Sequence, residues 1–449
     1  QGESTAAARP IRFATPKTFS SGVDYTAYVA VGDFNGDGYP DLAISSTYNN
    51  VAVFLGKGNG TFGAPTVYTL TFYVTGQLVV GDFNGDGKLD MAVVGGDEAG
   101  NGLAFFAGNG DGTFQPVQYF PTTLARSEIS AVAGDFNKDC KLDIFTGANG
   151  SSELIVGDGK GNFKDGPLVD VFGFGVAAGD FSQNGNLDVA LTSAFAEPAP
   201  GVNVVLGNGD ATFHAPAFYS ITNEPGSIIA ADFNGDKKLD LAVSNGAGVV
   251  ILQGNGDGTF TNTGQWNAGY GTAGMAAADF NMDGKVDLAV ANFDGNGVTI
   301  LPGQGNGTFP TSFGIATAAA ASDVAAVDLN GDGSTDLVVV NHGANSVSVL
   351  LNSEGTFIEL KSSSNPGTAG KPVTFTATIK GSIVKSPAPS GTITFKAGTK
   401  VLGRVAISDG KASFTTSALD KGSYSITAAY SGNGNFNPNL SKILIEKIQ

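Results

Sequence analysis

A nine-residue, aspartate-rich phrase occurs seven times in the chain, and this repeat constrains the fold more than any other feature. The first copy reads Asp33-Phe34-Asn35-Gly36-Asp37-Gly38-Tyr39-Pro40-Asp41, and its first Asp recurs at 82, 135, 180, 232, 279 and 328, which are 45–53 residues apart. A second phrase follows each copy by about 20 residues and ends in Phe, at positions 62, 114, 163, 213, 260, 309 and 357. Repeats of this length indicate stacked or radial supersecondary units.

Short strand-like runs lie between the phrases. In the first repeat they are Tyr28–Val31, Asp41–Ser45, Val51–Leu55 and Thr61–Tyr68. Four short strands per repeat, joined by Gly, Asn and Asp turns, are typical of a propeller blade. A β-helix would have shorter repeats, and separate sandwiches would have longer ones. The sequence therefore predicts an all-β fold, a seven-bladed β-propeller followed by a small Ig-like β-sandwich.

The two ends of the repeat region suggest how the ring closes. The seventh repeat ends at Thr356–Glu359 and lacks the outer-strand pattern Phe-x-x-Pro-x-x-aromatic that its siblings carry. The N-terminus has this pattern at Phe13, Pro16 and Phe19. We expect a propeller over residues 1–358, with an N-terminal strand at about residues 11–20 closing the last blade.

Composition changes near residue 359, where the aspartate phrase ends and Lys, Ser and Thr become more frequent. Alternating runs follow at Val373–Ile379, Thr392–Lys396, Lys411–Phe414 and Ser423–Tyr430. Such hairpins suit a small sandwich over residues 359–449, joined through the polar link Lys361–Gly367.

The aspartate phrase has the donor pattern of a calcium loop. Positions 1, 3, 5 and 9 carry oxygen in all seven copies, and the carbonyl of position 7 adds a ligand. Calcium takes six to eight oxygens, and glycine at position 6 allows a positive φ. An EF-hand would need Glu at position 12, where this chain has Ile44, Val93 and Val243.

The alternative is that these residues only form Asx turns without metal. Seven copies favour calcium, because 20 carboxylates would stand at positions 1, 3, 5 and 9 and repel one another without a cation. Seven Ca²⁺ would bring the net charge from −17 to about −3.

These repeats resemble FG-GAP/VCBS repeats, which build bacterial propellers and the head of integrin α subunits. The resemblance implies up to seven Ca²⁺, one per blade, on the residues at positions 1, 3, 5, 7 and 9. These are Asp33, Asn35, Asp37, Tyr39, Asp41; Asp82, Asn84, Asp86, Lys88, Asp90; Asp135, Asn137, Asp139, Lys141, Asp143; Asp180, Ser182, Asn184, Asn186, Asp188; Asp232, Asn234, Asp236, Lys238, Asp240; Asp279, Asn281, Asp283, Lys285, Asp287; and Asp328, Asn330, Asp332, Ser334, Asp336.

The chain departs from this pattern at four places. Cys140 and Lys237 replace the glycine of position 6, and we expect both loops still to bind; a redox switch at Cys140 is the alternative for that residue. The fourth loop has only two carboxylates and should be the weakest site. Ser45-Ser46-Thr47 replaces the Gly-Ala-Pro that integrins carry, so integrin ligands are not implied.

The tail resembles bacterial Ig-like domains of surface proteins, on Gly391–Phe395 and Ala429–Phe436. The chain starts without Met or an apolar leader, like a mature terminus. We therefore expect an extracellular or cell-surface location, in a bacterium, with the signal peptide already removed. No apolar run of 18 residues occurs, which predicts no membrane insertion, and the net charge of −17 argues against nucleic acid.

No catalytic motif is recognisable, and His214 and His342 belong to none. In a four-stranded blade the aspartate loops and the Gly-x-Gly turns share one face. Ligands should therefore bind the other face, which holds the variable loops. Its candidate residues are Tyr48–Asn50, Asp97, Glu98, Arg126, Glu128, Phe172–Phe174, Phe195–Glu197, Trp266, Tyr270, Phe293, Asp294 and His342.

Three functions remain open. The first is a non-enzymatic recognition or adhesion protein that binds a glycan or protein ligand, with calcium as its only cofactor. The second is a polysaccharide lyase or sugar dehydratase, which would need a base or metal in the central cleft, for which the sequence shows no candidate. The third is a structural stalk.

Overall fold

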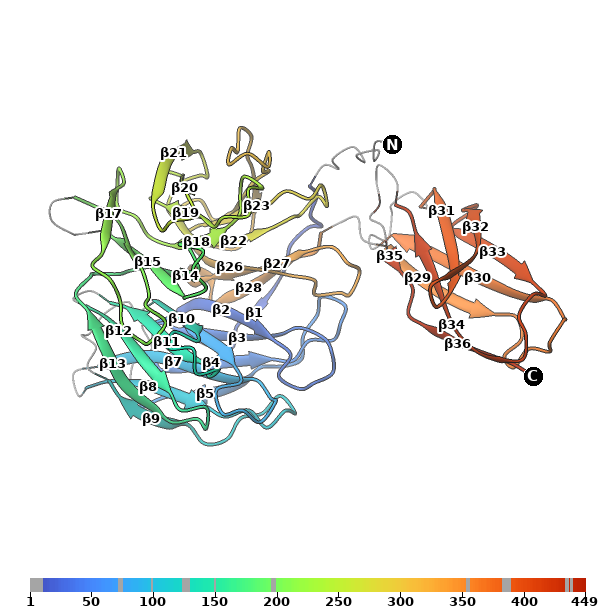
Figure 1. Cartoon of the computed structure of the whole chain (residues 1–449), viewed down its shortest axis with the longest axis horizontal. Coiled ribbons are helices and arrows are strands. Elements are labelled where there is room, and N and C mark those ends of the chain that lie inside the picture. Colours follow the sequence, from blue (N-terminus) through green and yellow to red (C-terminus); the bar gives the residue numbers. More distant parts are fainter. Residues whose placement is uncertain are drawn as a thin grey trace.

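The computed structural model describes residues 11–71, 76–97, 100–122, 130–148, 151–194, 199–352, 356–381, 389–432, 436 and 439–449. Its regular structure is all β, apart from one 3-10 turn at His342–Ala344 within the described residues. Seven four-stranded antiparallel sheets are arranged around a common centre, and two further sheets form a separate unit (Figure 1). The fold is a seven-bladed β-propeller followed by an Ig-like β-sandwich.

We number the sheets as blades 1 to 7, and each blade except the last uses four consecutive strands. Blade 1 is β2 (Thr26–Gly32), β3 (Asp41–Ser46), β4 (Asn50–Phe54) and β5 (Thr66–Thr69). Blade 2 is β6 (Leu78–Gly81), β7 (Asp90–Asp97), β8 (Gly100–Phe106) and β9 (Gln118–Pro121). Blade 3 is β10 (Ser130–Gly134), β11 (Asp143–Gly147), β12 (Ser152–Gly157) and β13 (Phe163–Val169).

The same order continues around the ring. Blade 4 is β14 (Val176–Gly179), β15 (Asp188–Ser193), β16 (Gly201–Val205) and β17 (Ala217–Ser220). Blade 5 is β18 (Ile228–Ala231), β19 (Asp240–Ser244), β20 (Val249–Gly254) and β21 (Phe260–Trp266). Blade 6 is β22 (Thr272–Ala278), β23 (Asp287–Asn292), β24 (Gly297–Leu301) and β25 (Phe313–Ala316).

The middle strands of each blade form the core because both of their faces are covered by neighbouring blades. All residues of β3, β15 and β23 are buried, whereas the outer strands β5, β17 and β25 are mostly exposed. This burial explains why the middle strands read as continuous runs of Val, Leu, Ile and Ala. Outer strands expose one face, so polar residues alternate there.

Aromatic pairs join six of the seven blades to the next. The residue at position 2 of each aspartate loop is buried; it is Phe in six loops, where it contacts a Phe of the following blade, and Leu329 in the seventh, which lies in one cluster with Phe62. The ring centroids of Phe34 and Phe114 are 5.5 Å apart, and those of Phe181 and Phe260 are also 5.5 Å apart. Main-chain bonds follow the same path, since Gly112 N donates to Phe34 O and Gly258 N to Phe181 O. The two repeated phrases therefore interlock across every blade boundary of this kind.

Blade 7 takes its outer strand from the N-terminus. It contains β26 (Ala321–Val327), β27 (Asp336–Asn341), β28 (Ser346–Leu350) and β1 (Lys17–Ser20), and β1 pairs with β28 from Lys17↔Val349 to Ser20↔Ser346. The pattern at Phe13, Pro16 and Phe19 predicts this arrangement.

The sequence assigns the seventh second phrase to Phe357, and this assignment is wrong. Phe13 takes that place, because it bridges Asn352 and packs 5.8 Å from Phe280, the position 2 residue of blade 6. The Asn352 side-chain amide donates to Phe280 O at 2.7 Å, the carbonyl of position 2 that a glycine N–H reaches in other blades.

Thr356–Ser362 forms β29, which belongs to the sandwich and pairs with β30 (Val373–Gly381). The stretch Lys361–Gly367 is therefore no interdomain link; it lies at the end of β29 and between β29 and β30. One sheet is β29, β30 and β33 (Lys411–Thr416). The other is β32 (Lys400–Ala406), β31 (Thr392–Ala397), β34 (Gly422–Tyr430) and β35 (Asn439–Leu440), with β36 (Leu444–Ile448) on β34. Phe375, Phe395 and Ile426 are buried between these sheets.

The propeller has two distinct faces, which follow from strand order. The aspartate loops connect the first and second strands of each blade, and in blades 1 to 6 the turns of the second phrase connect the third and fourth strands, so both lie at one face. We call this the loop face and the other the variable face. Among the described residues, no helix is long and apolar enough to cross a membrane.

Candidate metal loops and axial cavity

Each aspartate loop is closed by hydrogen bonds from its own main chain. In blade 1, Asp33 accepts from the N–H groups of Gly36, Asp37 and Gly38 at 2.8–3.1 Å. Asn35 Oδ1 accepts from Asp37 N at 2.9 Å, and Asp37 Oδ1 accepts from Tyr39 N at 2.8 Å. Side chains at positions 1, 3 and 5 are thereby turned toward the inside of one tight loop.

Two positions of every loop have positive φ. Position 6 does so in all seven loops, including Cys140 at φ 62° and Lys237 at φ 67°. Position 4 does so as well, and there the chain has Lys138, Gln183 and Met282 in three loops. The loop backbone is therefore retained where glycine is replaced, although a non-glycine residue is strained in this region.

The aspartate at position 9 ties three parts of the blade together. Asp41 is fully buried, and it accepts from Phe34 N at 2.8 Å and from Gly56 N at 2.7 Å. Asp336 repeats this with Leu329 N at 3.0 Å and Asn352 N at 2.7 Å. The repeat pattern singled out position 9 as a ligand, but gave no sign of this second role in joining the loop to the third-strand turn.

Burial makes these carboxylates costly to ionise in the absence of a cation. Desolvation raises the pKa of Asp287 to about 7 and that of Asp336 to about 8, and the nearby aspartates of the same loop add to the increase. Main-chain hydrogen bonds lower both pKa values, but by less. The pKa values of Asp143 and Asp240 are raised to about 6 for the same reasons. A cation at the loop would remove this penalty.

The seventh loop gives the clearest test of fit to a metal. Asp332 is fully buried, and its Oδ2 has no hydrogen-bond partner. Burial raises the pKa of Asp332 to about 6. An unpartnered carboxylate oxygen, in a loop with two further aspartates and Asn330, matches the hard oxygen donors that Ca²⁺ prefers.

Lysine occupies position 7 in four loops and partly compensates the aspartate at position 5. The Lys–Asp pairs are 88–86, 141–139, 238–236 and 285–283, with Nζ–Oδ2 distances of 3.3–3.8 Å. Within the described residues, no three His, Cys, Asp or Glu side chains are gathered as a ready metal site. Calcium binding in these loops would therefore displace the exposed lysine ammonium groups. Amide and main-chain oxygens would be ligands beside the carboxylates.

The fourth loop is the most altered. Ser182 replaces the amide of position 3, and its Oγ donates to Asp188 Oδ2 at 3.0 Å. Asn184 replaces the aspartate of position 5, although it keeps the turn by accepting from Asn186 N at 2.7 Å. The loop backbone survives with one carboxylate fewer.

On the variable face, four aromatic rings form a continuous row across blades 6, 7 and 1. Tyr48 contacts Tyr25 with centroids 4.8 Å apart, Tyr25 contacts His342 at 5.6 Å, and His342 contacts Phe293 at 5.6 Å. Tyr25, Tyr48 and Phe293 are exposed by 41–48%. We call these four residues the aromatic row. The sequence singled out Tyr48, Phe293 and His342 but missed Tyr25.

Tyr25 has a strained backbone conformation, and its neighbours hold it in place. Its φ is 54°, an outlier for a bulky residue. Asn345 accepts from Tyr25 N at 2.7 Å and donates to Asp24 Oδ1 at 2.9 Å. His342 Nδ1 lies 2.9 Å from Thr26 O, and because a carbonyl only accepts, Nδ1 carries the proton and Nε2 is an acceptor.

Other expected contact residues have different environments. Trp266 is the last residue of β21 and packs 6.4 Å from Phe309, so its interpretation as a surface-loop aromatic is wrong. Tyr270 is 79% exposed and Phe172 is 45% exposed. Glu98, Arg126, Glu128 and Phe195–Glu197 lie outside the described residues.

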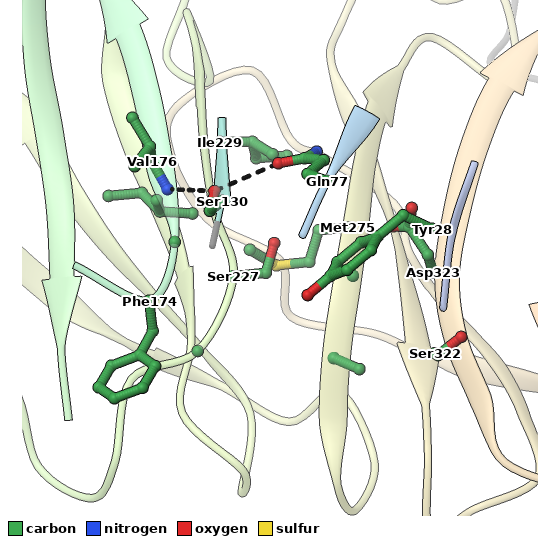
Figure 2. A pocket seen from close by; sticks show the side chains of 15 residues that line it. Tyr28, Gln77, Ser130, Phe174, Val176, Ser227, Ile229, Met275, Ser322 and Asp323 are labelled. Carbon is green, nitrogen blue, oxygen red and sulfur yellow. Dashed lines mark hydrogen bonds between the residues drawn. The ribbon is translucent and has the colours of Figure 1, made fainter. Parts of the chain in front are cut away.

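An axial cavity of about 230 Å³ lies where the first strands of the blades begin (Figure 2). All seven blades contribute to its wall. Ser130 Oγ, in that wall, donates to Gln77 Oε1 at 3.2 Å and accepts from Val176 N at 3.0 Å. Because first strands run from the variable face toward the aspartate loops, the cavity lies toward the variable face.

Asp323 is a buried carboxyl in this wall, with only 8% of its surface exposed. Its Oδ2 accepts from Val29 N of blade 1 at 3.0 Å, and its Oδ1 accepts from Val324 N at 2.9 Å. Burial raises the pKa of Asp323 to about 7, although both hydrogen bonds lower it. No candidate base in the central cleft is expected from the sequence, and the position of Asp323 corrects that interpretation.

The chain belongs to the FG-GAP-like repeat family. This family matches residues 33–93, 82–146, 135–191, 232–290 and 279–339, which together cover more than half of the chain. The family of bacterial Ig-like domains (group 3) matches residues 360–447. Neither family description names an enzyme. No curated protein matches the chain.

Several solved structures share the propeller. The structure of BBS1N in complex with ARL6DN, soaked with mercury, is 10% identical, with a TM-score of 0.53 over 76% of this chain and 97% of that chain. The lead-soaked form gives 10% identity and a TM-score of 0.52 over 76% and 96%. A lectin from Agrocybe aegerita that recognises non-reducing terminal N-acetylglucosamine is 17% identical, with a TM-score of 0.48 over 74% and 97%. At such identities the likeness of the BBS1N structures concerns the fold alone.

Proposed function

We propose that this chain is a secreted or cell-surface recognition protein, whose propeller binds a glycan or protein ligand on the variable face and is stabilised by calcium on the loop face. The observation that carries the proposal is the aromatic row. Exposed aromatic side chains with polar groups beside them are typical of recognition surfaces, because a rigid ring offers a large contact area at little entropic cost.

The polar side chains beside the aromatic row favour a glycan ligand over a protein ligand. Asp24 and Asn345 lie beside Tyr25, so hydroxyl donors of a ligand would meet acceptors there. The backbone strain at Tyr25 also favours this site, because strained residues persist where the surrounding structure holds them for a purpose. The net charge of −17 opposes a polyanionic ligand.

Calcium enters the proposal through the loop face. The residues that would hold it are those of positions 1, 3, 5 and 9, with the carbonyl of position 7. When bound, Ca²⁺ would supply positive charge to carboxylates that are otherwise buried with raised pKa values. Because position 2 of each loop packs on the next blade, a rigid loop would also stabilise the joint between blades.

A lyase or dehydratase is the second candidate, and Asp323 is the observation that favours it. A carboxyl with a pKa of about 7 could serve as a general base in the axial cavity. Against this, the residues that line the cavity include no Lys, Arg or His to bind a uronic acid.

A glycan array probed with and without calcium tests the proposal. We expect the calcium-loaded protein to bind a set of glycans without product formation, and the Tyr25→Ala and Tyr48→Ala variants to lose that binding at unchanged melting temperature. Phe218→Ala is the matched control, because Phe218 is equally exposed but lies on the outer strand β17. Turnover of a polyuronide would support the lyase instead, and equal binding by Tyr25→Ala and Phe218→Ala would contradict the aromatic row.

A further inference from the structure

Blades 6, 7 and 1 have first strands that differ from those of the other blades. β22, β26 and β2 are each seven residues long, whereas the first strands of blades 2 to 5 have four or five. The pairing of each long strand with its neighbour shifts register, between Thr272 and Met275, between Ala321 and Asp323, and between Thr26 and Tyr28.

The residues that follow these three shifts all lie in the cavity wall. They are Met275, Asp323 and Tyr28, and they line the axial cavity together with residues of the regular blades such as Ser130 and Ser227 (Figure 2). β-bulges are frequent next to functional sites because they turn one side chain out of the regular alternation. Three register shifts therefore lie in strands that line one cavity, in three adjacent blades.

The glycine opposite Asp323 shows that the cavity wall is built around this carboxyl. A Cβ on Gly274 would lie 2.1 Å from Asp323 Oδ1 and 2.8 Å from its Cα. Only glycine at residue 274 leaves room for Asp323 in this position. The carboxyl and the glycine come from the adjacent blades 7 and 6, and the bond of Asp323 to Val29 N of blade 1 requires the closed ring.

The chemistry of the wall defines the ligand class. Tyr28 and Ser227 bring hydroxyl groups to the cavity wall beside the carboxyl of Asp323, while Phe174 and Met275 supply apolar surface. Ser322 also lines the cavity, but its hydroxyl donates to Ala27 O at 2.9 Å. None of the lining residues is a cation. The volume of about 230 Å³ is below that of pockets for drug-sized ligands. A single ring with hydroxyl groups fits both the size and the polarity.

We propose that the axial cavity binds one hydroxylated sugar unit, neutral or amine-bearing but not acidic, with Tyr28, Ser227 and Asp323 as contact residues. The proposal rests on the proposed function, since this unit would be part of the glycan that the variable face binds. Segment Tyr25–Tyr28 joins the two regions: Tyr25 is in the aromatic row, Thr26 O accepts from His342, and Tyr28 lines the cavity.

Calorimetric titration with methyl glucoside, glucosamine, N-acetylglucosamine and glucuronate tests the cavity. We expect at least one neutral or amine-bearing sugar to bind and glucuronate not to bind. Ser227→Leu fills the cavity and should weaken binding at least about tenfold. Ser220→Leu is the matched control, because Ser220 lies at the exposed end of β17 and should leave binding unchanged.

Further variants distinguish the possible results. Tyr28→Phe removes one hydroxyl and should weaken binding severalfold, and Asp323→Asn should remove any preference for glucosamine over methyl glucoside. Unchanged sugar binding in folded Ser227→Leu would overturn the cavity proposal. Array binding that depends on Tyr25 but not on Ser227 would overturn it while leaving the proposed function intact. Sugar binding in the cavity with a silent array would support the cavity and contradict recognition of longer glycans, and no binding in either assay would contradict both.

Discussion

The two faces of the propeller differ in what they repeat. The loop face presents the same closed turn seven times, with a buried aspartate at position 9 and positive φ at positions 4 and 6. The variable face differs from blade to blade: its exposed aromatic row is built by blades 6, 7 and 1, and the wall of its axial cavity has a different side chain from each blade. Loops that repeat in every blade stabilise the ring as a whole. Side chains that occur in one blade only are suited to recognition of a particular ligand.

Carboxylates show the same contrast. Those of the loop face stand in groups with amide and main-chain oxygens, so one cation per loop would compensate them. Asp323 on the variable side stands alone in its wall and is compensated only by two N–H groups. We therefore expect calcium to bind at the loop face and the ligand at the variable face.

The largest expected effect is the removal of calcium. At ten times Kd, one site contributes about 1.4 kcal/mol to the free energy of unfolding, and seven sites give an upper bound of about 10 kcal/mol. We expect affinities on the order of 0.1–1 mM, as in extracellular modules. Thermal melting in 10 mM calcium and in EDTA checks this, with a fall of about 10 °C or more expected in EDTA. An equal melting temperature in calcium and in EDTA would contradict the proposal that calcium on the loop face stabilises the fold.

Deleting residues 1–20 should have the next largest effect. The deletion removes β1 and Phe13, so β28 becomes an unpaired edge and Phe280 loses its partner. We expect aggregation or early melting, measured by light scattering during a thermal ramp. Deletion of residues 1–10 is the control, since it leaves β1 and Phe13 in place. Equal behaviour of both truncations would show that the N-terminal strand is dispensable.

Asp323 should make stability depend on pH even when calcium fills the loops. Its pKa is about 7 in the folded chain and 3.8 unfolded, so the unfolded state ionises first as pH rises. Its stability contribution is full below pH 4 and is lost as pH rises to about 7, by at most about 4 kcal/mol. Urea unfolding at pH 4 to 7.5 should give a smaller decline for Asp323→Asn than for the parent chain. If the free energy of unfolding fell equally with pH in Asp323→Asn and in the parent chain, the raised pKa of Asp323 would be contradicted.

The smallest effect concerns the strained loop positions. Cys140 and Lys237 hold φ values of 62° and 67° at position 6, where the other loops have glycine. Cys140→Gly and Lys237→Gly should each stabilise the chain by about 1 kcal/mol in urea unfolding, because the strain of a left-handed side-chain residue is removed. Gly38→Ala, at φ 81° with open space around a new Cβ, should destabilise by a similar amount. Destabilisation by Cys140→Gly would favour a specific role for the thiol.

Periodic features of the fold were predictable from the sequence because they depend on local chemistry repeated seven times. Blade number, strand order, positive φ at position 6 and the alternation in the sandwich all follow from such patterns. The start of the sandwich was misplaced because Phe357 follows Gly355 and Thr356 in the same short phrase as the blades. Only pairing with β30, a tertiary contact, separates it from blade 7.

Features that arise once were not predictable. Asp323 carries no motif, and its position in the cavity depends on a register shift and on Gly274 of another blade. The place of Tyr25 in the aromatic row depends on its contacts with Asn345 and His342, which are more than 300 residues away in sequence. Trp266 looked like a loop aromatic because the strand β21 extends further than its sequence pattern indicates.

The central claim, that the aspartate loops hold calcium, is tested most directly by a crystal grown in 10 mM calcium chloride, with anomalous scattering compared across the seven loops. We expect a peak within coordination distance of positions 1, 3, 5, 7 and 9 in each loop. The weakest peak should lie at Asp180 and Asp188, where Ser182 and Asn184 leave only two carboxylates. Loops without any peak would contradict the claim, and a full site at Asp180 beside an empty three-carboxylate loop would contradict the argument from charge.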